Sequence, residues 1–264
     1  AYEELTPFNL LEIINTKSML AHWMQGGFPD SILAPNKKVQ QTWMRNFIQT
    51  YIERDLPMLG LSADRGTIRK VWTMIAHMHG NLLNMSNLAK SLELTSPTIK
   101  SYLSFLEEAF LIRQLPTYTN NLKKRLVKAP KVYIRDSGIL HFLLRINSMD
   151  ELEGMPVIGN SWEGYVIEQI CQIGQNEFEP HFYRTHEGAE IDLVLLKAGK
   201  PVYSIEIKYT SAPKLSRGNT QAFQDINAKE NFIVTPNSDD YYLTEDIRVC
   251  NLNSFLKLLI QELN

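Results

Sequence analysis

Alternating apolar and polar positions are most regular over residues 188–209, where they predict two strands joined by a tight turn. The turn is supplied by Ala198-Gly199-Lys200. A hairpin centred on the glycine of this turn places Asp192 opposite Glu206. Because strand side chains alternate between faces, both carboxylates are expected on the same side of the hairpin.

Two further charged residues, Glu190 and Lys208, share that face and are expected to form an ordinary cross-strand ion pair. The opposition of Asp192 and Glu206 differs, because like charges placed directly opposite one another destabilise a sheet. Three explanations stay open: another register, a protonated carboxyl group, or a cation between the two. Mg²⁺ fits the third, because it is bound through one or two carboxylates completed by waters and substrate phosphate.

Helical periodicity dominates the first part of the chain, with one helix predicted at about 39–56. Further along, two helices separated by the turn Glu93-Leu94-Thr95 form a helix-turn-helix pattern. The second helix begins at Ser96-Pro97, which supply an N-cap and a first helical residue, and it runs to about Phe110. This helix is the predicted recognition helix of a winged-helix domain, and Lys100 lies on its expected outward face.

The remainder of the chain predicts helices and strands in alternation. A polar stretch at 147–154 marks the expected domain boundary, and a helix follows with Ser161 as its N-cap. Beyond the hairpin and this helix, we expect strands at 182–184, 232–234 and 247–249 and helices at 219–227 and 252–263. The fold class predicted for this part is α/β with a mixed central sheet, and the whole chain is α+β.

Composition places the chain among ordinary globular proteins, since 44% of its 264 residues are apolar and 21% are charged. The net charge is −2, so any affinity for nucleic acid must come from local basic patches. One such patch is the stretch 119–131, which has no acidic residue. Its basic residues are Lys123, Lys124, Arg125, Lys128 and Lys131. This basic stretch lies where the wing of the winged-helix domain is expected. Contact with phosphates and a protein-docking or structural role both stay open for it.

Cysteine usage and the absence of several motifs narrow the cellular compartment and the kinds of functional site that the sequence predicts. Cys171 and Cys250 are expected to be reduced, which suits a cytoplasmic protein, and no apolar stretch is long enough to span a membrane. No zinc-site spacing, no convincing Ser/His/Asp or Cys/His arrangement and no GxxxxGK[ST] loop occurs. This sequence by itself therefore predicts no P-loop nucleotide site.

Asp192, followed by Glu206-Ile207-Lys208, resembles the Asp…(Asp/Glu)-x-Lys signature of the restriction-endonuclease-like, or PD-(D/E)xK, nucleases. The proline that precedes the family's aspartate is replaced here by Ile191, and Glu163 matches the glutamate of the family's first helix. The resemblance implies that Asp192 and Glu206 hold Mg²⁺ or Mn²⁺, that Glu163 binds a second metal or its water, and that Lys208 is catalytic. A domain that keeps this architecture without its chemistry is the alternative.

The strings LTPFNLLEI, WMQGGFPDS and FIQTYIERDLPMLG resemble a prokaryotic family of predicted AAA-type ATPases. In that family small helices, a winged helix and a nuclease-like domain follow the P-loop module. The resemblance implies a lid-like helical segment at 1–60, a winged helix-turn-helix domain at 61–147 and a nuclease-like domain at 148–264. Since the sequence begins at Ala1 without a methionine, we expect a C-terminal part of a longer protein, with ATP bound only by the full-length parent.

Two functional hypotheses follow from these resemblances. In the first, the winged helix binds DNA and a metal-dependent phosphodiesterase centre cuts it, coupled to an ATPase module in cis. In the second, the nuclease-like domain is an inactive scaffold that binds DNA or protein in an ATPase assembly. Arg54 is either a nucleotide-sensing arginine or one half of an exposed charge pair with Asp55. A homo-oligomer is possible under both hypotheses, and no membrane association is expected.

Overall fold

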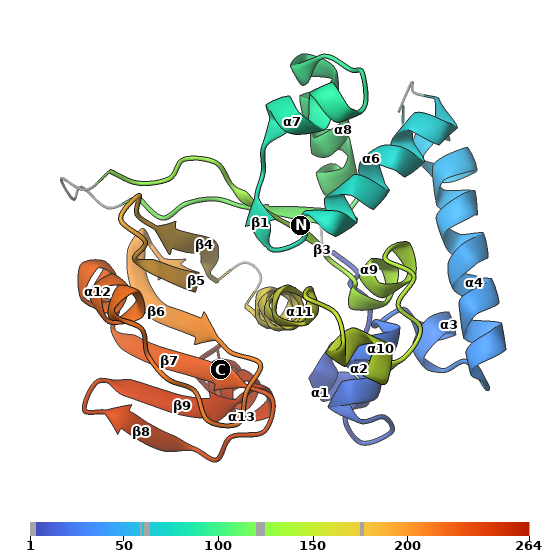
Figure 1. Cartoon of the computed structure of the whole chain (residues 1–264). Helices are drawn as coiled ribbons and strands as arrows, with labels where there is room; N and C mark the ends of the chain where they lie inside the picture. Colours follow the sequence, from blue (N-terminus) through green and yellow to red (C-terminus); the bar gives the residue numbers. More distant parts are fainter. Residues whose placement is uncertain (1–3, 59, 61–63, 120–124, 175–176, 264) are drawn as a thin grey trace. The chain divides into compact units, whose positions relative to one another are not determined.

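The structure, a computed structural model, describes residues 4–58, 60, 64–119, 125–174 and 177–263. The chain divides into two compact units (Figure 1). The first unit comprises Ala1–Gln114 with Val132–Gly164, and the second comprises Leu115–Lys131 with Tyr165–Asn264. The α/β class is confirmed, with helices and sheets in both units. The predicted three-part division at residues 60 and 147 stays a prediction.

The first unit is mainly helical. Its elements are α1 (Leu10–Ile13), α2 (Met19–Gln25), α3 (Pro29–Ile32), α4 (Lys37–Thr50), the π-helix η1 (Tyr51–Asp55), α5 (Leu56–Met58), α6 (Arg65–His77), β1 (Asn81–Leu82), α7 (Met85–Ser91), α8 (Ser96–Glu108), β2 (Ile112–Leu115), β3 (Lys131–Ile134), α9 (Ser137–Leu143), α10 (Met149–Glu153) and the first part of α11 (Ile158–Ile173). The polar stretch expected as a boundary forms the short helix α10.

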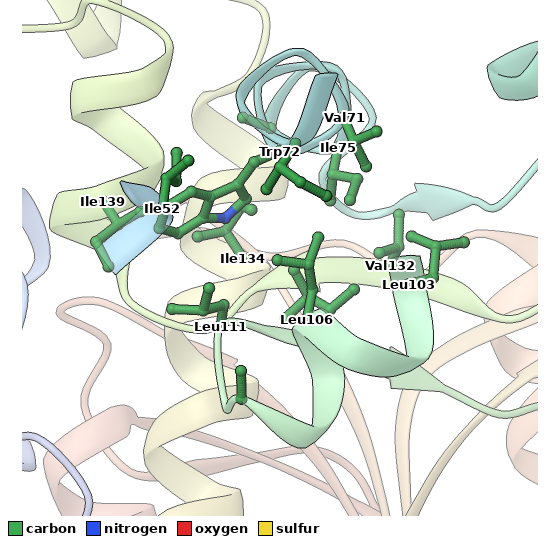
Figure 2. Close-up of a cluster of buried hydrophobic side chains, with 14 of the residues drawn as sticks. Ile52, Val71, Trp72, Ile75, Leu103, Leu106, Leu111, Val132, Ile134 and Ile139 are labelled. Atoms are coloured by element: carbon green, nitrogen blue, oxygen red, sulfur yellow. The ribbon is translucent and has the colours of Figure 1, made fainter. Parts of the chain in front are cut away.

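Side chains of α6, α8 and β3 form the core of this unit (Figure 2). Trp72 is fully buried and lies in the same cluster as Ile52 and Ile139. Strands β1, β3 and β2 form a three-stranded sheet in that order. The cluster therefore joins the helices before the helix-turn-helix to the strands that follow it.

The second helix of the helix-turn-helix pattern, α8, begins one residue earlier than predicted. The hydroxyl of Thr95 caps α8 by accepting a hydrogen bond from the Thr98 N–H at 3.3 Å, so Ser96 is the first helical residue instead of the cap. The side chain of Asn84 caps α7 through the Asn87 N–H. The earlier start of α8 follows from capping chemistry, because Thr competes with Ser for the N-cap position.

The second unit is built on a six-stranded sheet with the order β4-β5-β6-β7-β9-β8. Its strands and later helices are β4 (Glu179–Arg184), β5 (Glu190–Lys197), β6 (Lys200–Ile207), α12 (Arg217–Ile226), β7 (Glu230–Thr235), β8 (Tyr241–Thr244), β9 (Ile247–Asn251) and α13 (Leu252–Leu263). Strands β6, β7 and β9 run parallel, and the remaining pairs are antiparallel. The predicted mixed sheet is thus confirmed.

Helices cover the two faces of this sheet. Phe232 of β7 contacts Phe255 of α13, with ring centroids 5.0 Å apart. Its neighbour Ile233 packs instead in a cluster with Ala222 and Phe223 of α12. Since adjacent strand residues point to opposite faces, α12 and α13 lie on opposite sides of the sheet. None of the described helices is long and apolar enough to cross a bilayer.

Candidate carboxylate–lysine site

The β5–β6 hairpin has the register that the sequence predicts. Leu193 lies opposite Ile205 and Leu195 opposite Tyr203, so Asp192 and Glu206 come next along the two strands. The turn itself is shorter than predicted. Ala198 and Gly199 have φ values of 52° and 73° and form a two-residue turn flanked by Lys197 and Lys200. A bulge between Leu195 and Leu196 offsets the shorter turn and restores the register.

Three predicted site residues meet where β5 begins and β6 ends. The carboxylate oxygen Oδ2 of Asp192 accepts a hydrogen bond from the backbone N–H of Ile207 at 2.9 Å. Glu206 forms an ion pair with Lys208, whose Nζ lies 2.5 Å from Oε1. Asp192 and Glu206 are buried, whereas the Lys208 side chain is 36% exposed. The structure therefore brings together two acidic groups and one ammonium that solvent can reach.

Lysine side chains neutralise the opposed carboxylates, an arrangement that the three sequence-based explanations did not include. Lys131 places its Nζ 2.9 Å from Glu190 Oε1 and 3.3 Å from Asp192 Oδ1. Arg184 also contacts Glu190, at 3.4 Å. The expected ion pair of Glu190 with Lys208 is corrected accordingly: Glu190 is paired with Lys131 and Arg184, and Lys208 with Glu206. Lys131 is 61 residues from Asp192, so no local pattern indicated the contact.

Glu163, the fourth predicted catalytic residue, lies on α11 in the part that belongs to the first unit. It is buried, and the Tyr133 hydroxyl donates a hydrogen bond to its Oε1 at 2.5 Å. The role of Glu163 in a metal centre stays a prediction. Ser161 is not the N-cap of this helix, because α11 begins at Ile158 and Ser161 follows within its first turn.

The second unit offers a hard-oxygen donor set of two carboxylates, from Asp192 and Glu206. Within the part of the chain that the structure describes, no three His, Cys, Asp or Glu side chains gather closely enough to hold a metal ion. Two carboxylates nevertheless suit Mg²⁺, which takes the rest of its octahedron from waters and substrate phosphate. The donor chemistry therefore fits a magnesium ion that is completed by its substrate.

The basic stretch at 119–131, called the basic segment below, belongs to the second unit, and its described part from Arg125 onward lies against the end of β4. The Arg125 carbonyl accepts a hydrogen bond from the His186 N–H at 3.0 Å, and Leu126 forms an antiparallel bridge with Thr185. Arg125 and Lys128 are exposed. Lys123 and Lys124 lie outside the described residues. The described basic residues thus lie at the same end of the sheet as the carboxylates of Asp192 and Glu206.

Two further sequence candidates are exposed residues of the first unit. Lys100 is exposed on α8. The Arg54 side chain is 67% exposed on the π-helix η1, and its Nε lies 2.7 Å from Asp55 Oδ1. Hydrogen bonding to Asp55 and its negative charge raise the pKa of Arg54. The exposed charge pair is present, and a nucleotide-sensing role stays a prediction.

A buried polar network in the first unit carried no signal in the sequence. Trp23 donates its Nε1–H to the Ser161 hydroxyl at 3.0 Å, and His141 Nε2 lies 2.8 Å from the same oxygen. The other ring nitrogen of His141 lies 3.1 Å from the Met24 carbonyl oxygen. Ser161 is fully buried, so this serine–histidine pair joins three helices and offers no surface to a substrate. Cys171 and Cys250 are not joined by a disulfide, as predicted.

Comparisons with known proteins match most of the chain. A family model described as Domain of unknown function (DUF8612) matches residues 16–150, and another described as Domain of unknown function (DUF4143) matches residues 158–255. Uncharacterized proteins of Mycobacterium tuberculosis and Mycobacterium bovis are each 38% identical over 226 residues, which is 85% of this chain and 51% of the relative. The chain thus spans about half the length of the curated relatives it matches.

One solved structure is similar to the chain at a low level. It is an assembly of Thermococcus gammatolerans McrB AAA+ hexamers with bound McrC. The alignment covers 75% of this chain and 52% of that chain, with 9% sequence identity and a TM-score of 0.30. A TM-score of this size does not establish a common fold.

Proposed function

This chain belongs to the family described as Domain of unknown function (DUF8612), and we propose that it is a nucleic-acid-binding protein with a Mg²⁺-dependent phosphodiesterase centre in its second unit. The observation that carries the proposal is the convergence of the carboxylate–lysine site and the basic segment at one end of the sheet. Leu126 forms a β-bridge with Thr185, and the neighbouring Arg184 lies opposite Glu190 on β5. Further along β5, the Asp192 carboxylate accepts a hydrogen bond from the Ile207 N–H of β6. Basic and acidic groups therefore lie across neighbouring strands.

Each group has a role that its position permits. Arg125 and Lys128, being exposed, bind backbone phosphates of the nucleic acid. Asp192 and Glu206 would hold Mg²⁺, which would supply Lewis-acid polarisation of the scissile phosphate and activation of a water. Lys208 reaches solvent beside them, where its ammonium orients the attacking water and offsets charge that develops on the phosphate. Glu163 is proposed to bind a second metal or its water on the strength of the resemblance alone.

The first unit adds a second contact with nucleic acid. Helices α7 and α8 follow one another through a short turn, as in DNA-binding helix-turn-helix proteins. Exposed Lys100 and Ser101 on α8 supply a cation and a hydroxyl to a groove. The unit is proposed to position the duplex, while the second unit acts on its backbone.

Coupling to an ATPase module in cis is part of the proposal. About half of each mycobacterial relative lies outside the matched region, which leaves room for such a module. Exposed Arg54 is the residue of the lid-like segment that a neighbouring nucleotide site could use. ATP is therefore proposed as a ligand of the full-length parent only.

A scaffold without catalysis is the second candidate, and Lys131 is the observation that favours it. Its ammonium pairs with Glu190 and Asp192, and Arg184 also contacts Glu190, so two cations face these two carboxylates and no metal is required for their charge balance. In this case the same end of the sheet binds nucleic acid or a partner protein without cutting.

Salt-dependent binding tests the contact with phosphates. We expect Arg125→Ala with Lys128→Ala to reduce the slope of log K against log salt by about two for duplex DNA of any sequence, because each lost phosphate contact releases roughly one fewer counterion. Fluorescence anisotropy of a labelled duplex measures this slope. The matched control is Lys197→Ala with Lys200→Ala, which removes two exposed cations at the far end of the hairpin. Equal effects of both pairs, or no effect of the first, would contradict phosphate binding at this end of the sheet.

A further inference from the structure

Lys131 is the most buried cation of the carboxylate–lysine site. The residue is 3% exposed, and it ends the basic segment that belongs to the second unit. Its Nζ contacts carboxylate oxygens of Glu190 and Asp192 and lies 5.6 Å from the centre of the Phe182 ring. Two carboxylates therefore share one buried ammonium, which brings a positive charge into the site.

The Lys131 ammonium lies against the Asp192 carboxylate oxygen that a metal ion would bind. Asp192 has two carboxylate oxygens, and Oδ2 accepts the Ile207 N–H at 2.9 Å. Its other oxygen, Oδ1, faces Lys131 Nζ at 3.3 Å. A divalent cation bound at Oδ1 would lie within a few ångströms of the ammonium, and at such a separation in a partly dehydrated site the repulsion is strong.

We infer that Lys131 is the resident cation of this site and sets its affinity for divalent metal by competing for Asp192 Oδ1. A metal ion binds tightly only where the ammonium is absent or displaced. Glu190 shares the Lys131 ammonium with Asp192, and the ion pair with Glu190 is the shorter of the two. The inference rests on the proposed metal centre, but it concerns metal occupancy and not cleavage.

Direct metal binding tests this inference without any assay of activity. We expect Lys131→Met, which keeps an unbranched side chain but removes the charged terminal group, to bind Mn²⁺ about tenfold more tightly than the parent protein or better. Electron paramagnetic resonance of free Mn²⁺, or calorimetric titration, measures the affinity. Lys131→Arg is the matched control, because it keeps the positive charge and should retain weak binding. Adding Asp192→Asn to Lys131→Met should abolish the gain.

An Mn²⁺ affinity that is the same in Lys131→Met and in the parent would overturn the inference. So would a gain that survives Asp192→Asn. If Lys131→Met does not fold, Glu190→Gln supplies a second test. Loss of the Glu190 charge leaves Asp192 as the remaining acidic contact of the two, so Mn²⁺ binding should weaken. Unchanged or tighter binding in Glu190→Gln would equally overturn it.

These outcomes are separable from those of the proposed function. Tight Mn²⁺ binding by Lys131→Met, together with an absence of DNA cleavage by the parent protein, would support the inference and remove the phosphodiesterase. Mg²⁺-dependent cleavage by the parent, with the same metal affinity in the parent and in Lys131→Met, would support the phosphodiesterase and overturn the inference.

Discussion

Three of the six histidines, His22, His79 and His141, are buried in the first unit. Burial lowers the pKa of His22 and His141 to about 4 and that of His79 to about 3. The Ile134 N–H donates to Nδ1 of His79 at 3.0 Å, so this neutral ring carries its proton on Nε2. His79 lies beyond the end of α6 and is hydrogen-bonded to β3.

These histidines predict a loss of stability at mildly acidic pH. In the unfolded chain each has a pKa near 6.5, so unfolding at pH 5 should take up about three protons at these positions. Their contribution is complete above pH 6.5 and is lost as pH falls towards 4, with a slope on the order of 4 kcal/mol per pH unit near pH 5. Urea unfolding across this range, with calorimetry in two buffers to count protons, measures it. A free energy of unfolding that stays flat from pH 6.5 to 5 would contradict the buried, neutral rings.

Sequence reasoning found the residues of the site that are held by local chain geometry. Asp192, Glu206 and Lys208 lie on one hairpin, whose register follows from side-chain alternation and a tight turn. It missed Lys131, because the contact with Asp192 depends on how a distant segment lies against β4. The pair of His141 and Ser161 was missed for the same reason, since the two residues come from different helices.

At the scale of elements, helix α11 shows how one position can decide packing. Gly164 lies inside this helix, where glycine costs stability relative to alanine. A Cβ atom at this position would lie 2.2 Å from Nε2 of His79 and 3.1 Å from Cδ1 of Tyr133. Both neighbours are buried side chains, so neither moves at low cost. Glycine is therefore required by the close approach of α11 to His79 and Tyr133.

A matched pair of substitutions tests this packing. We expect Gly164→Ala to lower the free energy of unfolding by about 1–3 kcal/mol through overpacking. Gly159→Ala on the same helix should raise it by up to about 1 kcal/mol, because a Cβ atom there meets nothing within 4 Å and helix propensity improves. Chemical denaturation of both variants measures the difference. Equal effects, whatever their sign, would show that α11 does not approach His79 as closely as described.

Most elements could be predicted because their periodicity is regular, but their ends and the weakest strands could not. The predicted helix at 39–56 corresponds to α4 followed by η1 and α5, and the π-helical turn has no distinct hydrophobic pattern. Strand β8 was missed because all four of its residues are exposed, which leaves no alternation to detect. Strand β1 has two residues, too few for any pattern.

At the scale of the molecule, the chain passes between its two units more than once. Leu115–Lys131 leaves the first unit, joins the second, and is followed by Val132–Gly164 in the first. A boundary search by composition assumes that each domain is continuous, so it could not find this arrangement. The crossing brings Arg125, Lys128 and Lys131 into the unit that contains Asp192.

Nicking of supercoiled DNA tests the central claim most directly. The parent protein should convert supercoiled plasmid to the nicked form with Mg²⁺ or Mn²⁺ and not with excess chelator. Asp192→Asn and Lys208→Ala should each slow nicking by about 10²-fold or more, since Asp192 is proposed to hold the metal and Lys208 to offset the negative charge that develops on the phosphate. Lys197→Ala, an exposed lysine at the hairpin turn, should leave the rate unchanged. The absence of nicking by the parent protein at millimolar metal, or a rate that survives Asp192→Asn, would contradict the proposed phosphodiesterase.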